Sequence, residues 1–237
     1  MTTPIDRVLV VVPARDEEEL VGPCLAALAA AVEAVRRADP LIETAVVVVA
    51  DDCRDETAAR ARHAGARVVV TDAGCVGAAR RLGVEHGLAL LAPAAPERTW
   101  VASTDADTRV PPDWLTHQLG LAAGGTPLVI GRVVPDPAEL DPVTWRAWSE
   151  RHTAVAVDAH VHGANLGFRL DAYLAAGGWP RLAQHEDRHL VDALLAGGAP
   201  AELGRPVVTS GRLQGRVPDG FAGYLRDLRQ GPDPAAR

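Results

Sequence analysis

Short apolar runs alternate with longer helix-like segments through the first half of the chain. The run RVLVVVP at 7–13 is apolar without alternation, which is typical of a strand covered on both faces. Asp16 and Glu19 have the spacing of a capping box at a helix start. Repeated strand–helix units of this length predict an α/β fold with a doubly wound, mostly parallel sheet. The further expected elements are strands at 44–50, 66–71 and 99–104, and helices at 16–37, 55–63 and 74–91.

The second half is less regular, although its pattern still predicts elements. Trp145 and Trp148 lie three residues apart on an expected helix, which is typical of core packing, with a sugar-stacking platform as the alternative. No repeat or linker divides the sequence, so we expect a single domain. The expected elements are strands at 127–134, 160–170 and 206–211, and helices at 171–178, 186–198 and 219–229.

Four aspartates directly follow predicted strands: Asp51 and Asp52 after the second, and Asp105 and Asp107 after the fourth. Ligands of doubly wound sheets bind at the carboxyl ends of the strands. Strand alternation would send Asp105 and Asp107 to the same side, where they repel unless a cation lies between them or one stays protonated. A simple turn is the alternative, since Asp is common at strand ends. The clustering of four such residues indicates a binding site.

Composition narrows the possible chemistry. The 237 residues are 48% apolar, which is ample for a core, and the net charge of −7 argues against a nucleic-acid partner. All 24 basic residues are arginine, which excludes a Schiff-base lysine and the lysine of a P-loop. Three cysteines without metal-ligand spacing, and no signal-peptide pattern or apolar run near the ~20 residues of a membrane span, favour the reducing cytoplasm.

Two motifs suggest other classes of protein but fit them poorly. The segment at 74–91 starts like a nucleotide-binding glycine loop, yet it carries only Gly74 and Gly77 near its start and follows the third strand rather than the first. His185 to His189 matches H-E-x-x-H, the zinc-peptidase pattern, but a charged pair lies between the histidines and no apolar helical turn precedes them. Neither a dinucleotide cofactor nor a catalytic zinc is therefore expected.

Six blocks, in order between Val8 and Gly198, resemble the family 2 glycosyltransferases of the GT-A fold. They are VVPARDEEE, VVADDCRDET, GAARRLGVEHG, DADTRVPPDWL, GANLGFRLDAYLAAGGW and EDRHLVDALLAGG. Each block alone is weak, whereas the ordered set is specific. The resemblance fades beyond about Gly204.

The resemblance implies a metal-dependent, inverting transfer of a sugar from a nucleotide sugar, with a UDP-sugar favoured, to a hydroxyl acceptor. It implies Mn²⁺ or Mg²⁺ as the cofactor, because hard oxygen ligands favour these ions. Residues 1–110 would form the nucleotide-sugar-binding half of the domain and residues 111–237 the acceptor-binding half. A retaining glycosyltransferase or a nucleotidyltransferase on the same fold, and a non-catalytic sugar-binding relative, remain as alternatives.

Roles for individual residues also follow from the resemblance. Asp107 would be the metal ligand, Asp187 the catalytic base, and Glu186 an orienting group on the acceptor side. His160 and His162 lie on one face of the expected strand, so either could supply a further metal ligand, with His162 preferred. Gly163 and Asn165 would shape the floor of the sugar pocket. The expected donor-binding residues are Pro13, Ala14, Arg15, Glu17, Asp51, Asp52, Arg80 and Asp105.

Overall fold

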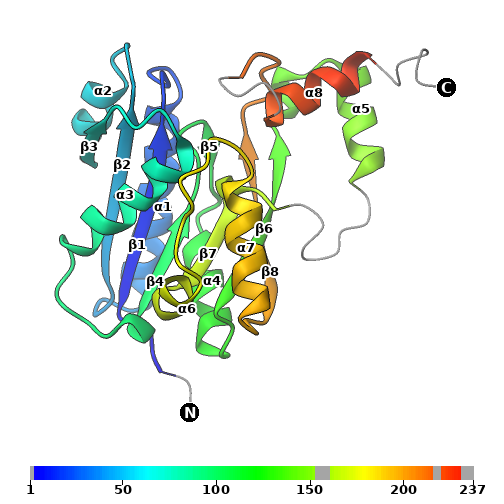
Figure 1. Cartoon of the computed structure of the whole chain (residues 1–237). Helices are drawn as coiled ribbons and strands as arrows, with labels where there is room; N and C mark the ends of the chain where they lie inside the picture. Colours follow the sequence, from blue (N-terminus) through cyan, green and yellow to red (C-terminus); the bar gives the residue numbers. More distant parts are fainter. Residues whose placement is uncertain (1–2, 153–160, 216–219, 231–237) are drawn as a thin grey trace.

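One mixed sheet forms the body of the protein. The computed structural model describes residues 3–152, 161–215 and 220–230, and within these ranges eight strands follow the order β3-β2-β1-β4-β7-β6-β8-β5 (Figure 1). Neighbouring strands are parallel except where β7 pairs with β4 and β6, and where β5 pairs with β8. The predicted mostly parallel α/β fold is confirmed. The strands are β1 (Arg7–Ala14), β2 (Glu43–Asp51), β3 (Arg67–Thr71), β4 (Thr99–Ser103), β5 (Thr108–Arg109), β6 (Leu128–Pro135), β7 (Leu166–Arg169) and β8 (Ala201–Thr209).

Helices cover both faces of the sheet, which explains the uninterrupted apolar run of β1. Val8, Val10 and Val12 point into a core with α1 and α4, whereas Leu9 and Val11 point into a second core with α3, α6 and α7. All five side chains are fully buried. The helices are α1 (Val21–Ala38), α2 (Thr57–His63), α3 (Val76–Leu88), α4 (Trp114–Ala123), α5 (Pro142–Arg151), α6 (Leu170–Ala175), α7 (Glu186–Ala196) and α8 (Phe221–Gln230), with short 3₁₀ turns η1 (Pro96–Arg98), η2 (Pro137–Glu139) and η3 (Gly163–Asn165).

A third, smaller core joins α5 to α8 beyond the carboxyl edge of the sheet (Figure 1). Trp148, Leu225 and Leu228 are its buried residues, and the ring of Trp145 stacks on that of Trp148 with centroids 5.4 Å apart. The predicted core packing of this tryptophan pair is confirmed.

The capping box predicted at the start of α1 is wrong. The helix begins at Val21, and its N-cap residue Leu20 makes no side-chain capping bond. The carboxylate of Asp16 instead accepts a hydrogen bond from the backbone N–H of Arg54 at 2.7 Å. The local pattern predicted that Asp16 caps the helix, but its side chain binds a backbone group on another loop.

Two predicted strands also change at the carboxyl edge. β4 ends at Ser103, so Asp105 and Asp107 lie on the turn before β5 rather than on alternating strand positions. Of the strand expected at 160–170, Leu166–Arg169 is extended and Gly163–Asn165 forms η3. Side chains on a turn do not alternate between two faces as they do on a strand, so Asp105 and Asp107 can contact different partners.

The close approach of α3 to β1 yields a prediction. A Cβ on Gly83 would lie 2.3 Å from Cγ1 of Val11 and 3.0 Å from Cγ2 of Val49. Because β-branched side chains have few rotamers, Gly83→Ala should lower the free energy of unfolding by about 1–3 kcal/mol. The control is Gly120→Ala, at an exposed α4 position where a Cβ meets no atom within 4 Å.

The control should raise the free energy of unfolding by about 0.5–1 kcal/mol, because alanine loses less backbone entropy in a helix. Urea denaturation followed by circular dichroism measures both variants. Equal shifts of the two midpoints would contradict the close approach of α3 to β1.

Candidate active site

A cleft of about 690 Å³ opens at the carboxyl edge of the sheet. Its walls come from the end of β2, from the loops that follow β1, β3 and β4, from the start of α7, from the segment after β8 and from α8. Most of the residues that the sequence indicated lie in these walls: Pro13, Ala14, Arg15, Glu17, Asp51, Arg80, Asp105, Asp107, His162, Gly163, Glu186 and Asp187.

Arg80 on α3 is the buried centre of the cleft. It is 2% exposed and donates to Asp105 at 2.7 Å and to Glu186. Its guanidinium also lies 5.0 Å from the ring centroid of Trp179, at cation–π distance. A Cβ on Gly163 would lie 2.4 Å from the guanidinium carbon, so a residue without a side chain is required there. Arg80 thus links three chain segments, and burial raises the pKa of Glu186 despite this cation.

Asp107 faces a second arginine, Arg212, which lies beyond the last recognisable block. One carboxylate oxygen, Oδ2, contacts Arg212 at 2.8 Å, and Oδ1 accepts from the hydroxyl of Thr209 at 3.2 Å. Arg212 also donates to both oxygens of Glu17, at 2.8 and 2.7 Å. Burial raises the pKa of Asp107 to about 6; Arg212 opposes this rise, whereas the nearby charges of Asp105 and Glu17 add to it.

The two aspartates at the end of β2 have different surroundings. The oxygens of Asp51 accept from the backbone N–H groups of Gly74 and Cys75, at 2.9 and 3.0 Å, and so hold the loop before α3 at the cleft. Asp52, with a left-handed φ of 51°, forms an ion pair with Arg15. Asp52 is absent from the described lining of the cleft, whereas its partner Arg15 belongs to it, and the expected contact of Asp52 with the donor stays a prediction.

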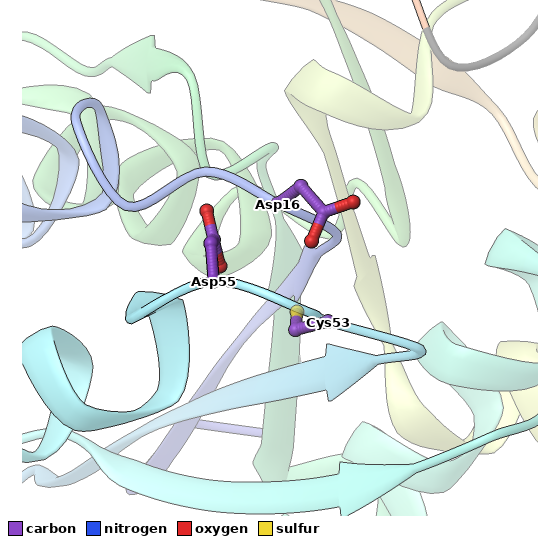
Figure 2. A group of neighbouring side chains, drawn as sticks. All are labelled: Asp16, Cys53 and Asp55. Carbon is purple, nitrogen blue, oxygen red and sulfur yellow. The ribbon is translucent and has the colours of Figure 1, made fainter.

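Asp16, on the loop after β1, lies close to Cys53 and Asp55 on the loop after β2 (Figure 2). Among the described residues, they form the one group of three potential metal ligands whose atoms lie within 4.8 Å of one another. Asp16 accepts from the backbone of Arg54, and Asp55 from that of Glu18 at 3.0 Å, while the thiol of Cys53 lies 3.4 Å from the carbonyl of Ala14. The group therefore fastens the loop after β1 to the loop after β2.

The start of α7 presents Asp187 to the cleft. Its Oδ2 accepts from the backbone N–H of Gly163 at 2.8 Å, and its Oδ1 from that of Arg188 at 2.7 Å. His185, just before the helix, has a left-handed φ of 59°, which turns the chain so that the acidic pair faces inward. Two backbone donors thus fix the orientation of this carboxylate.

Asn165 is the last residue of η3 and is fully buried. Its side chain has no exposed surface and does not line the cleft. Its amide donates to the carbonyls of Arg132 and Arg205, at 2.9 and 2.8 Å, and its oxygen accepts from the indole of Trp114 at 2.8 Å. These bonds occupy the side chain and hold η3 from below, and the part of Asn165 in shaping the floor of the sugar pocket stays a prediction.

Of the two histidines proposed as metal ligands, the structure describes only His162. His162 lines the cleft, with its ring 5.7 Å from that of Phe221 in an edge-to-face arrangement. Within the part of the chain that the structure describes, Asp107 and His162 do not belong to a preformed group of three ligands. His160 lies outside the described residues.

Sequence reasoning missed Arg212 and the aromatic rings of α8. Arg212 follows β8 in a segment where no motif remains, and it reaches Glu17 across 195 positions of sequence. Phe221 and Tyr224 lie three apart on a helix that was expected, but the pattern did not show that they face the cleft. Only the three-dimensional arrangement identifies these residues.

Arg80 generates a second prediction. Arg80→Gln leaves the buried carboxylate of Glu186 and that of Asp105 without their cation, so the free energy of unfolding should fall by about 3–5 kcal/mol. Arg36→Gln is the matched control, since Arg36 is 72% exposed and pairs only with Glu33 among the contacts described. Arg36→Gln should lower the free energy of unfolding by less than about 1 kcal/mol. Guanidinium chloride denaturation compares the two, and a loss as small as the control's would refute a central role for Arg80.

The sequence and the fold resemble those of known proteins. Residues 9–173 match the model of glycosyl transferase family 2. No curated protein gives a significant match. No helix within the described residues is both long enough and apolar enough to cross a membrane.

Solved structures share the fold at low identity. A structure described as that of a mycobacterial protein is 18% identical, with a TM-score of 0.60, over 94% of this chain and 72% of its own. Glucosyl-3-phosphoglycerate synthase from Mycobacterium tuberculosis, in complex with phosphoglyceric acid, is 18% identical, with a TM-score of 0.57, over 94% and 77%. The same enzyme in complex with Mn²⁺ and UDP-glucose is 16% identical, with a TM-score of 0.56, over 94% of this chain and 77% of its own. Because the family match spans more than half of the sequence and the fold agrees, this chain belongs to glycosyl transferase family 2 and is a glycosyltransferase.

Proposed function

We propose that the protein transfers a sugar from a nucleotide sugar, with a UDP-sugar favoured, to a hydroxyl acceptor by an inverting single displacement. One observation carries this proposal: Asp107 and Asp187, which are 80 positions apart, line the same cleft at the carboxyl edge of the sheet. The cleft volume of about 690 Å³ lies within the usual range for small-molecule sites. The solved relative with UDP-glucose and Mn²⁺ supports the choice of nucleotide.

The carboxylate groups of the cleft are suitable ligands for a divalent cation. Asp105 and Asp107 offer hard carboxylate oxygens, and the described walls of the cleft contain more carboxylates than guanidinium groups. Asp107 would hold Mn²⁺ or Mg²⁺, which acts as a Lewis acid on the leaving diphosphate. Arg212 contacts Oδ2 of Asp107, so a metal ion held by this carboxylate would lie beside a guanidinium group. Its two bonds to Glu17 would keep Arg212 in the cleft, near the phosphates.

Asp187 is the proposed general base. An inverting displacement needs a carboxylate that takes the proton of the acceptor hydroxyl as the new bond forms. The backbone N–H groups of Gly163 and Arg188 hold Asp187 in one orientation. Glu186 is committed to Arg80, so it supports the site rather than competing for this role. A retaining transferase, a nucleotidyltransferase and a non-catalytic binding protein remain the alternatives.

The nucleotide and metal assignment is tested by thermal shift. UDP should raise the Tm of the protein more with Mn²⁺ than with excess chelator, because the cation links Asp107 to the diphosphate. Asp107→Asn should abolish this difference, whereas Asp192→Asn, at a half-exposed α7 position, should retain it. A shift by UDP that is the same in chelator would contradict the metal assignment, and a shift by GDP alone would contradict the choice of UDP.

The base assignment is tested by turnover. Asp187→Asn should leave the response to UDP nearly unchanged, since an amide oxygen can still accept from Gly163, but should reduce the release of UDP from UDP-glucose by roughly 10²-fold or more. Asp192→Asn again serves as the control. Near-normal turnover would remove Asp187 from the mechanism, and a product with retained anomeric configuration in NMR spectra would overturn the inverting assignment.

A further inference from the structure

Helix α8 lies beyond the carboxyl ends of β6 and β8 (Figure 1). Aromatic rings line the cleft on this side. Phe221 and Tyr224 come from α8, with ring centroids 6.4 Å apart. The ring of His162 lies 5.7 Å from that of Phe221, and the ring of His152 lies 5.8 Å from that of Tyr224. We call these four residues the aromatic wall. Phe221, Tyr224 and His162 are only partly buried, so their surfaces are available to a ligand.

The aromatic wall adjoins the proposed base. Gly163, whose N–H holds Asp187, directly follows His162 of the wall. A molecule that lies against the wall can therefore bring a hydroxyl to Asp187. If Asp187 is the base, the acceptor rather than the nucleotide would lie on the side of α8.

The charges in the cleft disfavour an anionic acceptor. Its described lining carries six carboxylates and three guanidinium groups, a net formal charge of −3. Each of these arginines already contacts carboxylates: Arg15 pairs with Asp52, Arg80 with Asp105 and Glu186, and Arg212 with Glu17 and Asp107. A divalent cation and the diphosphate that it binds largely cancel one another, so the cleft stays negative with the donor in place.

We infer that the acceptor is an uncharged alcohol with an apolar face, such as a sugar ring or the aglycone attached to it. Aromatic rings pack well against such faces, while a negative cleft repels phosphate and carboxylate groups. This inference rests on the proposed function, because it assigns the acceptor of the same site. It separates this chain from the structural relative that was solved with phosphoglyceric acid, which is an anion.

Two probes that differ by one phosphate group test the inference: phenyl β-D-glucopyranoside and its 6-phosphate. Both are titrated by calorimetry into the full chain with UDP and Mn²⁺. The neutral probe should bind at least about 10-fold more tightly, because the phosphate would enter the same negative cleft. Equal binding, or preference for the phosphate, would overturn the inference, as would the absence of binding by both probes to a protein that still binds UDP.

A variant links the binding to the aromatic wall. Phe221→Ala should lower the affinity for the neutral probe by about 10-fold, while UDP still raises the Tm. The control Leu174→Ala, at an exposed α6 position, should change neither the affinity nor the response to UDP. Unchanged affinity in Phe221→Ala would remove the wall from acceptor binding. Binding of the neutral probe to a protein that does not respond to UDP would instead refute the proposed function and leave the acceptor side intact.

Discussion

The buried guanidinium of Arg80 is the contact on which the arrangement of the cleft depends. It joins α3 to the turn after β4 through Asp105, and to the start of α7 through Glu186. These segments are far apart in sequence, so no local pattern holds them together. Because an unpaired buried charge is costly, the cleft keeps its shape only while all three partners stay together. The need for a guanidinium is consistent with a chain whose basic residues are all arginine, since a planar fork can bond two carboxylates at once.

The hydrophobic pattern predicted much of the fold, because the formation of strands and helices depends on the nearby sequence. The run at 7–13 indicated a strand covered on both faces, and the structure buries both faces of β1. Asp107 and Asp187 could be proposed as site residues because they belong to ordered motifs, and both line the cleft. The capping prediction for Asp16 failed because a backbone N–H on another loop competes for its carboxylate.

Contacts between distant segments account for what the sequence could not show. The side chain of Asn165 belongs to a recognisable block, but its partners Trp114, Arg132 and Arg205 are spread over three other elements. A motif therefore identified the residue but could not show which side chains and carbonyls surround it. The aromatic wall escaped prediction for a related reason: helical spacing shows that Phe221 and Tyr224 share a face, but not what that face meets.

The bonds between Arg212 and Glu17 close a loop of 195 residues, from the start of the chain to the segment after β8. Contacts of such separation form late, because the entropy of closing the loop must be overcome first. During synthesis, the sheet from β1 to β4 leaves the ribosome well before Arg212 does. We expect the nascent chain to hold Glu17 and Asp107 as unbalanced acids through this period. This part of the cleft would thus be complete only after Arg212 has been synthesised and has reached Glu17.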